Sequence, residues 1–223
     1  MYVVVVGGIG TGKSFLVSQL AAHYSTVALL DNVYDNPYFS LFYQRPQEYA
    51  FHFQLYALLN KIKKINAIAK KTSIIQEKSI EEDVFIYSSY LNAVNIITEL
   101  DFQLYQQYFI DLKHLLPQPD LMIYLRADFQ NLYDAYKKRK LLFFDRSMEA
   151  YFQNIHYRYE YFFRFLCDPS KLLIVDIYAY DFKELKDFTQ LIQMIDAKLS
   201  GLQPKLAVSN DLIERAYSIL WKL

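Results

Sequence analysis

The strongest constraint on the fold of this chain is a glycine-rich octapeptide, Gly7–Ser14, which directly follows the apolar run Tyr2–Val6. The octapeptide fits the pattern G-x-x-x-x-G-K-[ST], and four of the chain's five glycines lie in it. A β-branched run before such a loop predicts a buried parallel strand, and the residues after the loop predict a helix. Loop N–H groups and the helix N-terminus then form a site for anions. The chain is therefore expected to bind the phosphates of a nucleoside triphosphate.

Each residue of the octapeptide is a candidate contact for the nucleotide. Lys13 is expected to reach the β- and γ-phosphates, and the Ser14 hydroxyl is expected to ligate Mg²⁺. The motif does not reveal what receives the phosphate, because GTPases, motor ATPases and small-molecule kinases all contain it. The expected nucleotide-binding residues are Gly7, Gly8, Ile9, Gly10, Thr11, Gly12, Lys13 and Ser14.

Short apolar runs alternate with segments of helical spacing along the rest of the chain. This alternation predicts an α/β fold, a doubly wound five-stranded parallel sheet flanked by helices, with ligands at the carboxyl ends of the strands. The expected strands are Tyr2–Val6, Thr26–Leu30, Thr72–Gln76, Leu121–Leu125 and Leu172–Val175. The expected helices are Lys13–Tyr24, Pro46–Lys70, one or two within Ile80–His114, Asn131–Arg139, Met148–Leu166 and about Phe182–Leu199.

The domain organisation is expected to be simple. No internal repeat or low-complexity linker divides residues 1–200, which are predicted to form one domain. Gly201 and Pro204 then break the chain, and residues 201–223 are predicted to form a C-terminal helical tail. Ser209 or Asn210 could cap the helix of this tail, which would reach Trp221.

Charge and cysteine content narrow the classes of partner. Lys and Arg together number 24, as do Asp and Glu, so no overall charge favours nucleic acid or a membrane surface. An anionic ligand must therefore be held by a local site. Cys167 is the only cysteine, which excludes an internal disulfide framework and is compatible with the cytoplasm. We find no signal peptide and no membrane span in the sequence, and we expect neither a nucleic-acid nor a membrane partner.

Several further motifs occur in a fixed order. Asp31-Asn32-Val33 is followed by Asp35-Asn36-Pro37-Tyr38, then by Glu77-Lys78-Ser79, and finally by the run Leu116–Ala127. Over about residues 1–182 this order resembles the deoxynucleoside kinases, especially the bacterial deoxyadenosine/deoxyguanosine kinases. The resemblance implies a P-loop kinase fold, ATP as donor, Mg²⁺ as metal and a deoxynucleoside as acceptor. It also implies a dimer formed through packed helices, either a homodimer or a heterodimer with a paralogue.

The resemblance places the acceptor pocket on five segments. Asp31 would accept the proton of the 5′-hydroxyl, although it is one methylene shorter than the usual Glu and could instead simply begin a turn. Tyr43 would hydrogen-bond the sugar 3′-hydroxyl. Gln54 would pair with the base edge beside the aromatic Phe53, or could be a polar residue on an amphipathic helix. Lys61, where many members have Arg, would pair with Asp83 and steady the base end of the pocket.

The resemblance also assigns residues around the phosphates. Glu77 would hold Mg²⁺. Lys78 replaces a family Arg that lies by the 5′ end of the nucleoside, so the planar guanidinium of that Arg is absent here. Arg126 would lie near the phosphates at the end of the fourth strand, and Asp176 near the loop that covers adenine. The expected catalytic residues are Lys13, Asp31, Lys78, Arg126 and Arg139.

The sequence departs from the family in its lid. The family's lid reads Arg-x-x-x-Arg-x-Arg before an acidic pair, and the aligned positions here are Ala135, Arg139 and Leu141. The acidic pair is replaced by Phe143 and Phe144, and the next residue, Asp145, could take the contact to the 3′-hydroxyl. Arg139 is thus the one lid arginine that clearly aligns, and it would contact the nucleotide. Lys138, Lys140 or Arg146 could substitute for the others from a shifted register. Because such arginines stabilise transition-state charge, their loss bears directly on activity.

Two hypotheses from different classes follow. The first is an active deoxynucleoside kinase that phosphorylates the 5′-hydroxyl of a deoxynucleoside in nucleotide salvage. A purine is the first expectation, from the run Asp35-Asn36-Pro37. The second is a nucleotide-binding pseudokinase or a regulatory partner of an active relative, which the altered lid and Lys78 favour. A thymidylate-type nucleotide kinase fits less well, because Gln54 and the run Glu77-Lys78-Ser79 point to a nucleoside.

Overall fold

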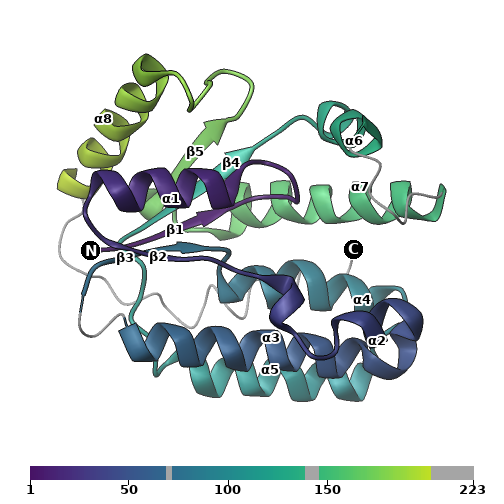
Figure 1. Cartoon of the computed structure of the whole chain (residues 1–223). Coiled ribbons are helices and arrows are strands. Elements are labelled where there is room, and N and C mark those ends of the chain that lie inside the picture. Colours follow the sequence, from purple (N-terminus) through teal and green to yellow (C-terminus); the bar gives the residue numbers. More distant parts are fainter. Residues whose placement is uncertain (69–71, 139–145, 202–223) are drawn as a thin grey trace.

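The core of the fold is a five-stranded parallel sheet with strand order β2-β3-β1-β4-β5 (Figure 1). The computed structural model describes residues 1–68, 72–138 and 146–201, without the side chains of residues 135–148. All strand pairs run parallel, so the prediction of a parallel five-stranded sheet is confirmed. The strands are β1 (Tyr2–Val6), β2 (Val27–Leu29), β3 (Ile74–Glu77), β4 (Leu121–Arg126) and β5 (Leu172–Asp176).

Helices cover both faces of the sheet (Figure 1). The α-helices of the described residues are α1 (Lys13–His23), α2 (Phe39–Gln44), α3 (Pro46–Ile68), α4 (Ser89–Ala93), α5 (Glu99–Lys113), α6 (Phe129–Lys138), α7 (Arg146–Tyr161) and α8 (Leu185–Gly201). Two π-helical segments, η2 (Glu82–Ser88) and η3 (Phe162–Leu166), and two short 3₁₀ segments, η1 (Val33–Asp35) and η4 (Pro169–Lys171), complete the elements. Among the described residues, no helix has the length and apolar character needed to cross a membrane.

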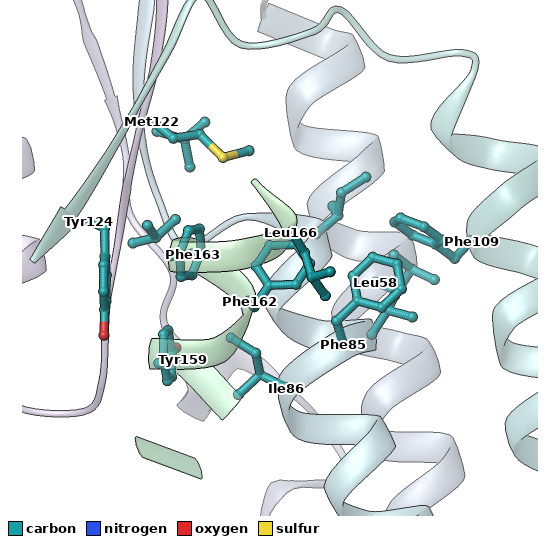
Figure 2. Packing of buried hydrophobic residues seen from close by; sticks show 14 of the residues in the cluster. Leu58, Phe85, Ile86, Phe109, Met122, Tyr124, Tyr159, Phe162, Phe163 and Leu166 are labelled. Carbon is teal, nitrogen blue, oxygen red and sulfur yellow. The ribbon is translucent and has the colours of Figure 1, made fainter. Parts of the chain in front are cut away.

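The two faces of the sheet bury different kinds of side chain. In β1, Val3 and Val5 belong to an aliphatic cluster with α1 and α8, whereas Val4 and Val6 belong to the opposite cluster. This alternation is the two-residue period of a strand that is buried on both faces. The opposite cluster joins the sheet to α3, η2, α5, α7 and η3, and it contains several buried aromatic rings. Figure 2 shows these rings packed between the sheet and the helices.

The segment Ile80–His114, predicted to contain one or two helices, contains two helical stretches. It contains the π-helical η2, then α4, then a break before α5. The break follows from Asn95, whose backbone is left-handed with φ of 57°, and from Thr98, whose side chain caps α5 by accepting the Asp101 N–H. In η2 the consecutive carboxylates of Glu82 and Asp83 are both fully buried. Hydrogen bonds hold Glu82 there and two lysine side chains hold Asp83, as described below. The helical spacing of the segment does not predict these buried charges.

Other boundaries differ by a few residues. The short helix α2 was not predicted. The helix predicted from Asn131 begins at Phe129. The last predicted helix begins at Leu185 rather than near Phe182, because the Asp181 N–H is bonded by the Asp187 side chain and a turn precedes α8. The predicted tail helix, residues 202–223, lies outside the described residues.

Phe163 tests the aromatic face of the core. Its ring is fully buried and stacks on Tyr124 with 4.9 Å between ring centroids. We expect Phe163→Ala to lower the free energy of unfolding by about 3–5 kcal/mol, because the lost ring leaves a cavity that the packed surroundings fill only in part. Denaturant unfolding measures this loss. The control Phe165→Ala removes a mostly exposed ring two positions after Phe163, and a similar loss of stability in both variants would contradict the assignment of Phe163 to the core.

Candidate active site

The phosphate loop connects β1 to α1. Gly12 lies at the N-cap of α1 with φ of 88°, and Gly7 follows β1 with φ of 147°. A Cβ at Gly7 would lie 2.8 Å from the carbonyl oxygen of Leu125, so the loop passes directly over the end of β4. Lys13 Nζ donates to the Gly8 carbonyl at 2.8 Å. Burial lowers the pKa of Lys13, while the Glu82 and Glu77 carboxylates oppose that shift.

Glu77 is brought to this loop by strand pairing. It is the last residue of β3, and the parallel register pairs it with Val5 at the end of β1. One of its carboxylate oxygens accepts the Ser14 hydroxyl at 2.8 Å. The other oxygen accepts the backbone N–H of Asp31 at 3.4 Å. The structure thus brings together Ser14 and Glu77, the two residues predicted to hold Mg²⁺, and it places Asp31 directly beside them.

Four charged side chains form a compact cluster next to Glu77, which we call the acceptor cluster: Asp31, Lys61, Lys78 and Asp83. Asp83 is fully buried and contacts Lys61 Nζ at 2.6 Å and Lys78 Nζ at 2.5 Å. The same two ammonium groups lie 3.7 and 3.9 Å from Asp31 Oδ2. Burial alone would raise the pKa of Asp31, but Lys61 and Lys78 outweigh it and hold that pKa below its usual value.

Lys78 has an unusual backbone at the start of the turn after β3. Its φ is 62°, a left-handed conformation that costs a non-glycine residue roughly 1–3 kcal/mol and that clusters at functional sites. The ammonium lies 4.3 Å from the centroid of the Tyr87 ring, within the range of a cation–π contact. Burial opposes the charge of Lys78, but Asp83 and Asp31 raise its pKa well above the ordinary value. Lys78 is therefore a fixed cation.

The residues predicted to line the nucleoside pocket lie on α2 and α3. Gln54 is buried on α3, and no hydrogen bond joins its side-chain amide to another described residue. The Phe53 ring stacks on Phe42 with centroids 4.8 Å apart, and the Phe53 carbonyl accepts the buried Asn36 amide at 2.9 Å. Tyr43 lies half exposed on α2, and burial raises the pKa of its hydroxyl. Lys61 lies two turns further along α3, which connects this pocket to the acceptor cluster.

Arg126 and Asp176 lie next to each other at the ends of paired strands β4 and β5. Arg126 Nε donates to both carboxylate oxygens of Glu160 at 3.0 Å, and Tyr124 donates its hydroxyl to the same carboxylate at 2.8 Å. Asp176 accepts the backbone N–H of Tyr178 at 2.9 Å and so shapes the turn after β5. In the structure these two residues help to hold α7 and the turn after β5 in place.

The predicted lid residues are outside the part of the chain that the structure describes. The segment 139–145 lies outside the described residues and contains Arg139, Leu141, Phe143, Phe144 and Asp145. The side chain of Ala135 is likewise not described. Their predicted roles therefore remain predictions.

Glu82 was missed by the sequence analysis. It lies fully buried behind the phosphate loop and accepts hydrogen bonds from Gly7 N–H at 3.3 Å and from Tyr159 OH at 2.7 Å. Its other oxygen accepts the Ser79 N–H at 2.5 Å. The signal in the sequence was a set of three acidic residues, Glu81, Glu82 and Asp83, inside an otherwise apolar segment. Such a pattern indicates carboxylates that are buried with partners, and the sequence predicted a partner, Lys61, only for Asp83.

A family model described as "Deoxynucleoside kinase" matches residues 3–199. The chain belongs to the deoxynucleoside kinase family. A deoxyadenosine/deoxycytidine kinase of Bacillus subtilis (strain 168) is 29% identical over 161 residues, which cover 71% of this chain and 74% of that relative. A deoxyadenosine kinase of Dictyostelium discoideum is 28% identical over 204 residues, 91% of this chain and 80% of that relative.

A solved structure has the same fold as this kinase. The deoxyadenosine kinase from M. mycoides, determined with dCMP and a flexible dCDP bound, has a TM-score of 0.74 at 22% identity. The match covers 88% of this chain and 100% of that structure. The P-loop kinase fold and the predicted family are confirmed. The enzyme is a nucleotide-binding transferase that phosphorylates nucleosides, and the comparisons do not favour the pseudokinase alternative.

The close approach at Gly7 yields a prediction for the phosphate loop. Gly7→Ala would place its Cβ against the Leu125 carbonyl, whereas a Cβ at Gly12 would meet no atom within 4 Å. Both variants carry the strain of a positive φ, which costs roughly 1–3 kcal/mol, and only Gly7→Ala adds the clash. We expect Gly7→Ala to weaken ATP binding at least about tenfold more than Gly12→Ala. Calorimetric titration of folded variants measures this, and equal losses would contradict the proposed approach of loop and strand.

Proposed function

We propose that this enzyme transfers the γ-phosphate of ATP to the 5′-hydroxyl of a purine deoxynucleoside and releases the 5′-monophosphate and ADP. One observation carries the proposal: Glu77 receives the Ser14 hydroxyl on one oxygen and the Asp31 N–H on the other. A single residue therefore joins the phosphate loop to the carboxylate that would face the nucleoside. Phosphoryl transfer depends mainly on such positioning of donor and acceptor.

Asp31 is proposed as the group that orients the 5′-hydroxyl and accepts its proton. Its side chain is 33% exposed, so it is open to a bound nucleoside. The two neighbouring lysines favour its ionised form, which is the form able to accept a proton. Lys78, fixed by Asp83 and Tyr87, would stabilise negative charge that develops beside the 5′ oxygen.

The donor site is proposed to hold Mg²⁺ with ATP. The Ser14 hydroxyl and the Glu77 carboxylate are hard oxygen ligands lying 2.8 Å apart, and Mg²⁺ commonly uses one or two such groups together with substrate phosphates and water. When bound, the ion would neutralise charge on the β- and γ-phosphates. Lys13 would exchange its bond to the Gly8 carbonyl for phosphate oxygens. Arg139 would add a positive charge from the lid. Arg126 would bind the phosphates after releasing Glu160. Asp176 would lie beside the adenine.

The base and sugar are proposed to bind along α2 and α3. The buried amide of Gln54 can read the donor and acceptor edge of a base, with Phe53 providing an apolar wall. Tyr43 and, from the lid, Asp145 would contact the 3′-hydroxyl. The named activities of the relatives include deoxyadenosine and deoxyguanosine phosphorylation, which supports a purine acceptor. The acceptor cluster carries two positive and two negative groups, and this balance suits a neutral nucleoside better than a charged nucleotide.

The activity itself is tested with Mg-ATP and each of the four deoxynucleosides. We expect labelled 5′-monophosphate, formed fastest from deoxyadenosine or deoxyguanosine. Asp31→Asn should lower kcat by roughly 100-fold or more, because a positioned proton acceptor contributes about 10²–10⁴-fold. Asp35→Asn, an exposed carboxylate in the neighbouring turn, is the matched control and should remain active. Failure of the wild type to form product from any nucleoside, despite ATP binding, would overturn the proposal.

Gln54 tests the assignment of the base pocket. Gln54→Ala should raise KM for the nucleoside by roughly 10-fold or more and leave KM for ATP nearly unchanged, because a lost hydrogen bond to a base edge costs about 1–3 kcal/mol. Steady-state kinetics with each substrate varied in turn separates the two constants. A similar rise in both would remove Gln54 from base recognition.

We also propose that two chains pair through the outer face of α5. Leu100, Leu104 and Tyr108 are exposed at four-residue spacing and so share one side of the helix, while Leu59 is exposed on the neighbouring α3. The partner would be a second copy or a paralogue.

A cytoplasmic location, in line with the single Cys167, also remains a prediction.

Sedimentation analysis tests the pairing. Leu104→Glu should shift a wild-type dimer toward monomer, because the variant would bury an unpaired charge in the apolar interface. Leu185→Glu changes an even more exposed leucine on α8, which packs on the other face of the sheet, and should leave the dimer intact. A wild type that sediments as a monomer would contradict the homodimer.

A further inference from the structure

Glu82 lies where the phosphate loop, the turn after β3 and α7 meet. It is the first residue of the π-helical η2 and has no exposed surface. It is not among the residues assigned to ATP, Mg²⁺ or the nucleoside. A carboxylate without solvent is costly unless donors surround it, so its partners indicate why it is there.

The partners of Glu82 are the backbones of two functional loops. Oε1 accepts the N–H of Gly7, the first residue of the phosphate loop, at 3.3 Å. Oε2 accepts the N–H of Ser79, the residue directly after Lys78, at 2.5 Å. The Glu82 N–H in turn donates to Ser79 Oγ at 3.2 Å. One rigid carboxylate therefore fixes the start of the donor loop relative to the turn that carries the acceptor-side cation.

A second connection runs through two tyrosines. Tyr159 on α7 donates its hydroxyl to Glu82 Oε1 at 2.7 Å, and its oxygen lies 3.1 Å from the Tyr87 hydroxyl. The Tyr87 ring lies beneath the Lys78 ammonium. Figure 2 shows Tyr159 held at the edge of the aromatic core beside Phe163, with which it stacks at 6.0 Å between centroids. Contacts are thus continuous from Gly7 through Glu82, Tyr159 and Tyr87 to Lys78.

The electrostatic surroundings of Glu82 agree with this arrangement. Burial raises its pKa, whereas Lys13, the Tyr159 hydroxyl, Lys78 and the Ser79 N–H oppose that rise. The opposing groups all belong to the two loops or to the tyrosine link. The same contacts that position the loops therefore also stabilise the carboxylate.

We propose that Glu82 is a positioning residue that sets the distance between the phosphate donor and the acceptor, with Tyr159 and Tyr87 extending its hold to Lys78. The inference rests on the proposed function, in which Gly7 begins the ATP site and Lys78 faces the 5′ end of the nucleoside. Reacting atoms must lie about 3–3.5 Å apart, and a misplacement of about 1 Å can lower the rate 100-fold. Each substrate can still bind its own loop when the two loops are misaligned.

Kinetics of Glu82→Gln and Tyr159→Phe test this inference. The amide of Gln offers one acceptor oxygen and turns an NH₂ group toward one of the two backbone donors, so we expect kcat to fall roughly 30-fold or more. Tyr159→Phe keeps the ring and should lower kcat roughly 5- to 10-fold. KM for ATP and for deoxyadenosine should each stay within about threefold in both variants. If the two variants lower the melting temperature but leave kcat per folded molecule unchanged, Glu82 has only a structural role and the inference is overturned.

Tyr24→Phe is the matched control. It removes another hydrogen bond from a tyrosine hydroxyl to a carboxylate, that of Asp196, at a similar 2.8 Å. This bond joins α8 to the residue after α1, on the opposite face of the sheet. Its kcat should equal that of the wild type. A fall in kcat like that of Tyr159→Phe would show that any lost tyrosine hydrogen bond has this effect, and would overturn the assignment to Glu82.

Amide hydrogen exchange separates this inference from the proposed function. In Glu82→Gln the amides of Gly7 and Ser79 should exchange at least about tenfold faster together, while the Thr26 amide, bonded to the Ala21 carbonyl, should not change. If the wild type forms no product but the two amides respond together, the proposed function fails and the link between the loops stands. If the wild type is active and the amides do not respond together, the link fails. Should Glu82→Gln not fold, the Gly7 amide in Tyr159→Phe gives the same test.

Discussion

The arrangement of the active site depends on the parallel pairing of β1 with β3. In this register Val5 lies opposite Glu77, so the two strands end within one residue of each other. The phosphate loop begins two residues after Val5, and the turn with Lys78 and Ser79 begins directly after Glu77. Because β2 pairs with the other edge of β3, the residues after β2 reach the same carboxylate. Three segments distant in the sequence therefore converge on one point without a long loop, as expected at the carboxyl edge of a doubly wound sheet.

Burial of charge is the main energetic burden of this site. Asp83 and Glu82 are consecutive and both fully buried, but they are compensated in different ways. Asp83 is paired with the ammonium groups of Lys61 and Lys78. Glu82 accepts N–H and O–H hydrogen bonds, and the nearby charges of Lys13 and Lys78 also favour its ionised form. Both carboxylates lie in the π-helical η2, and such segments are frequent at functional sites. Charge and dipole compensation together keep the acceptor side rigid.

Local patterns predicted the parts of the fold that local chemistry determines. The octapeptide Gly7–Ser14 and the β-branched strands were located from the sequence, since both depend on neighbours along the chain. Asp31 and Glu77 were assigned to the site through the family resemblance, and the structure places them in contact. Glu82 was missed because its partners Gly7 and Tyr159 lie 75 and 77 residues away. The left-handed backbone of Lys78 and the pairing of Arg126 with Glu160 likewise result from tertiary contacts that no sequence window contains.

The two faces of the sheet also differ in their optical properties. The buried cluster under α1 and α8 consists of aliphatic side chains, with aromatic rings only at its partly exposed border. The buried rings of Phe85, Phe109, Tyr124, Tyr159 and Phe163 all belong to the face formed by α3, α5 and α7, which carries the acceptor cluster. Near-ultraviolet circular dichroism arises from aromatic rings held in asymmetric surroundings. In this enzyme it therefore reports mainly on the face formed by α3, α5 and α7, and much less on the face formed by α1 and α8.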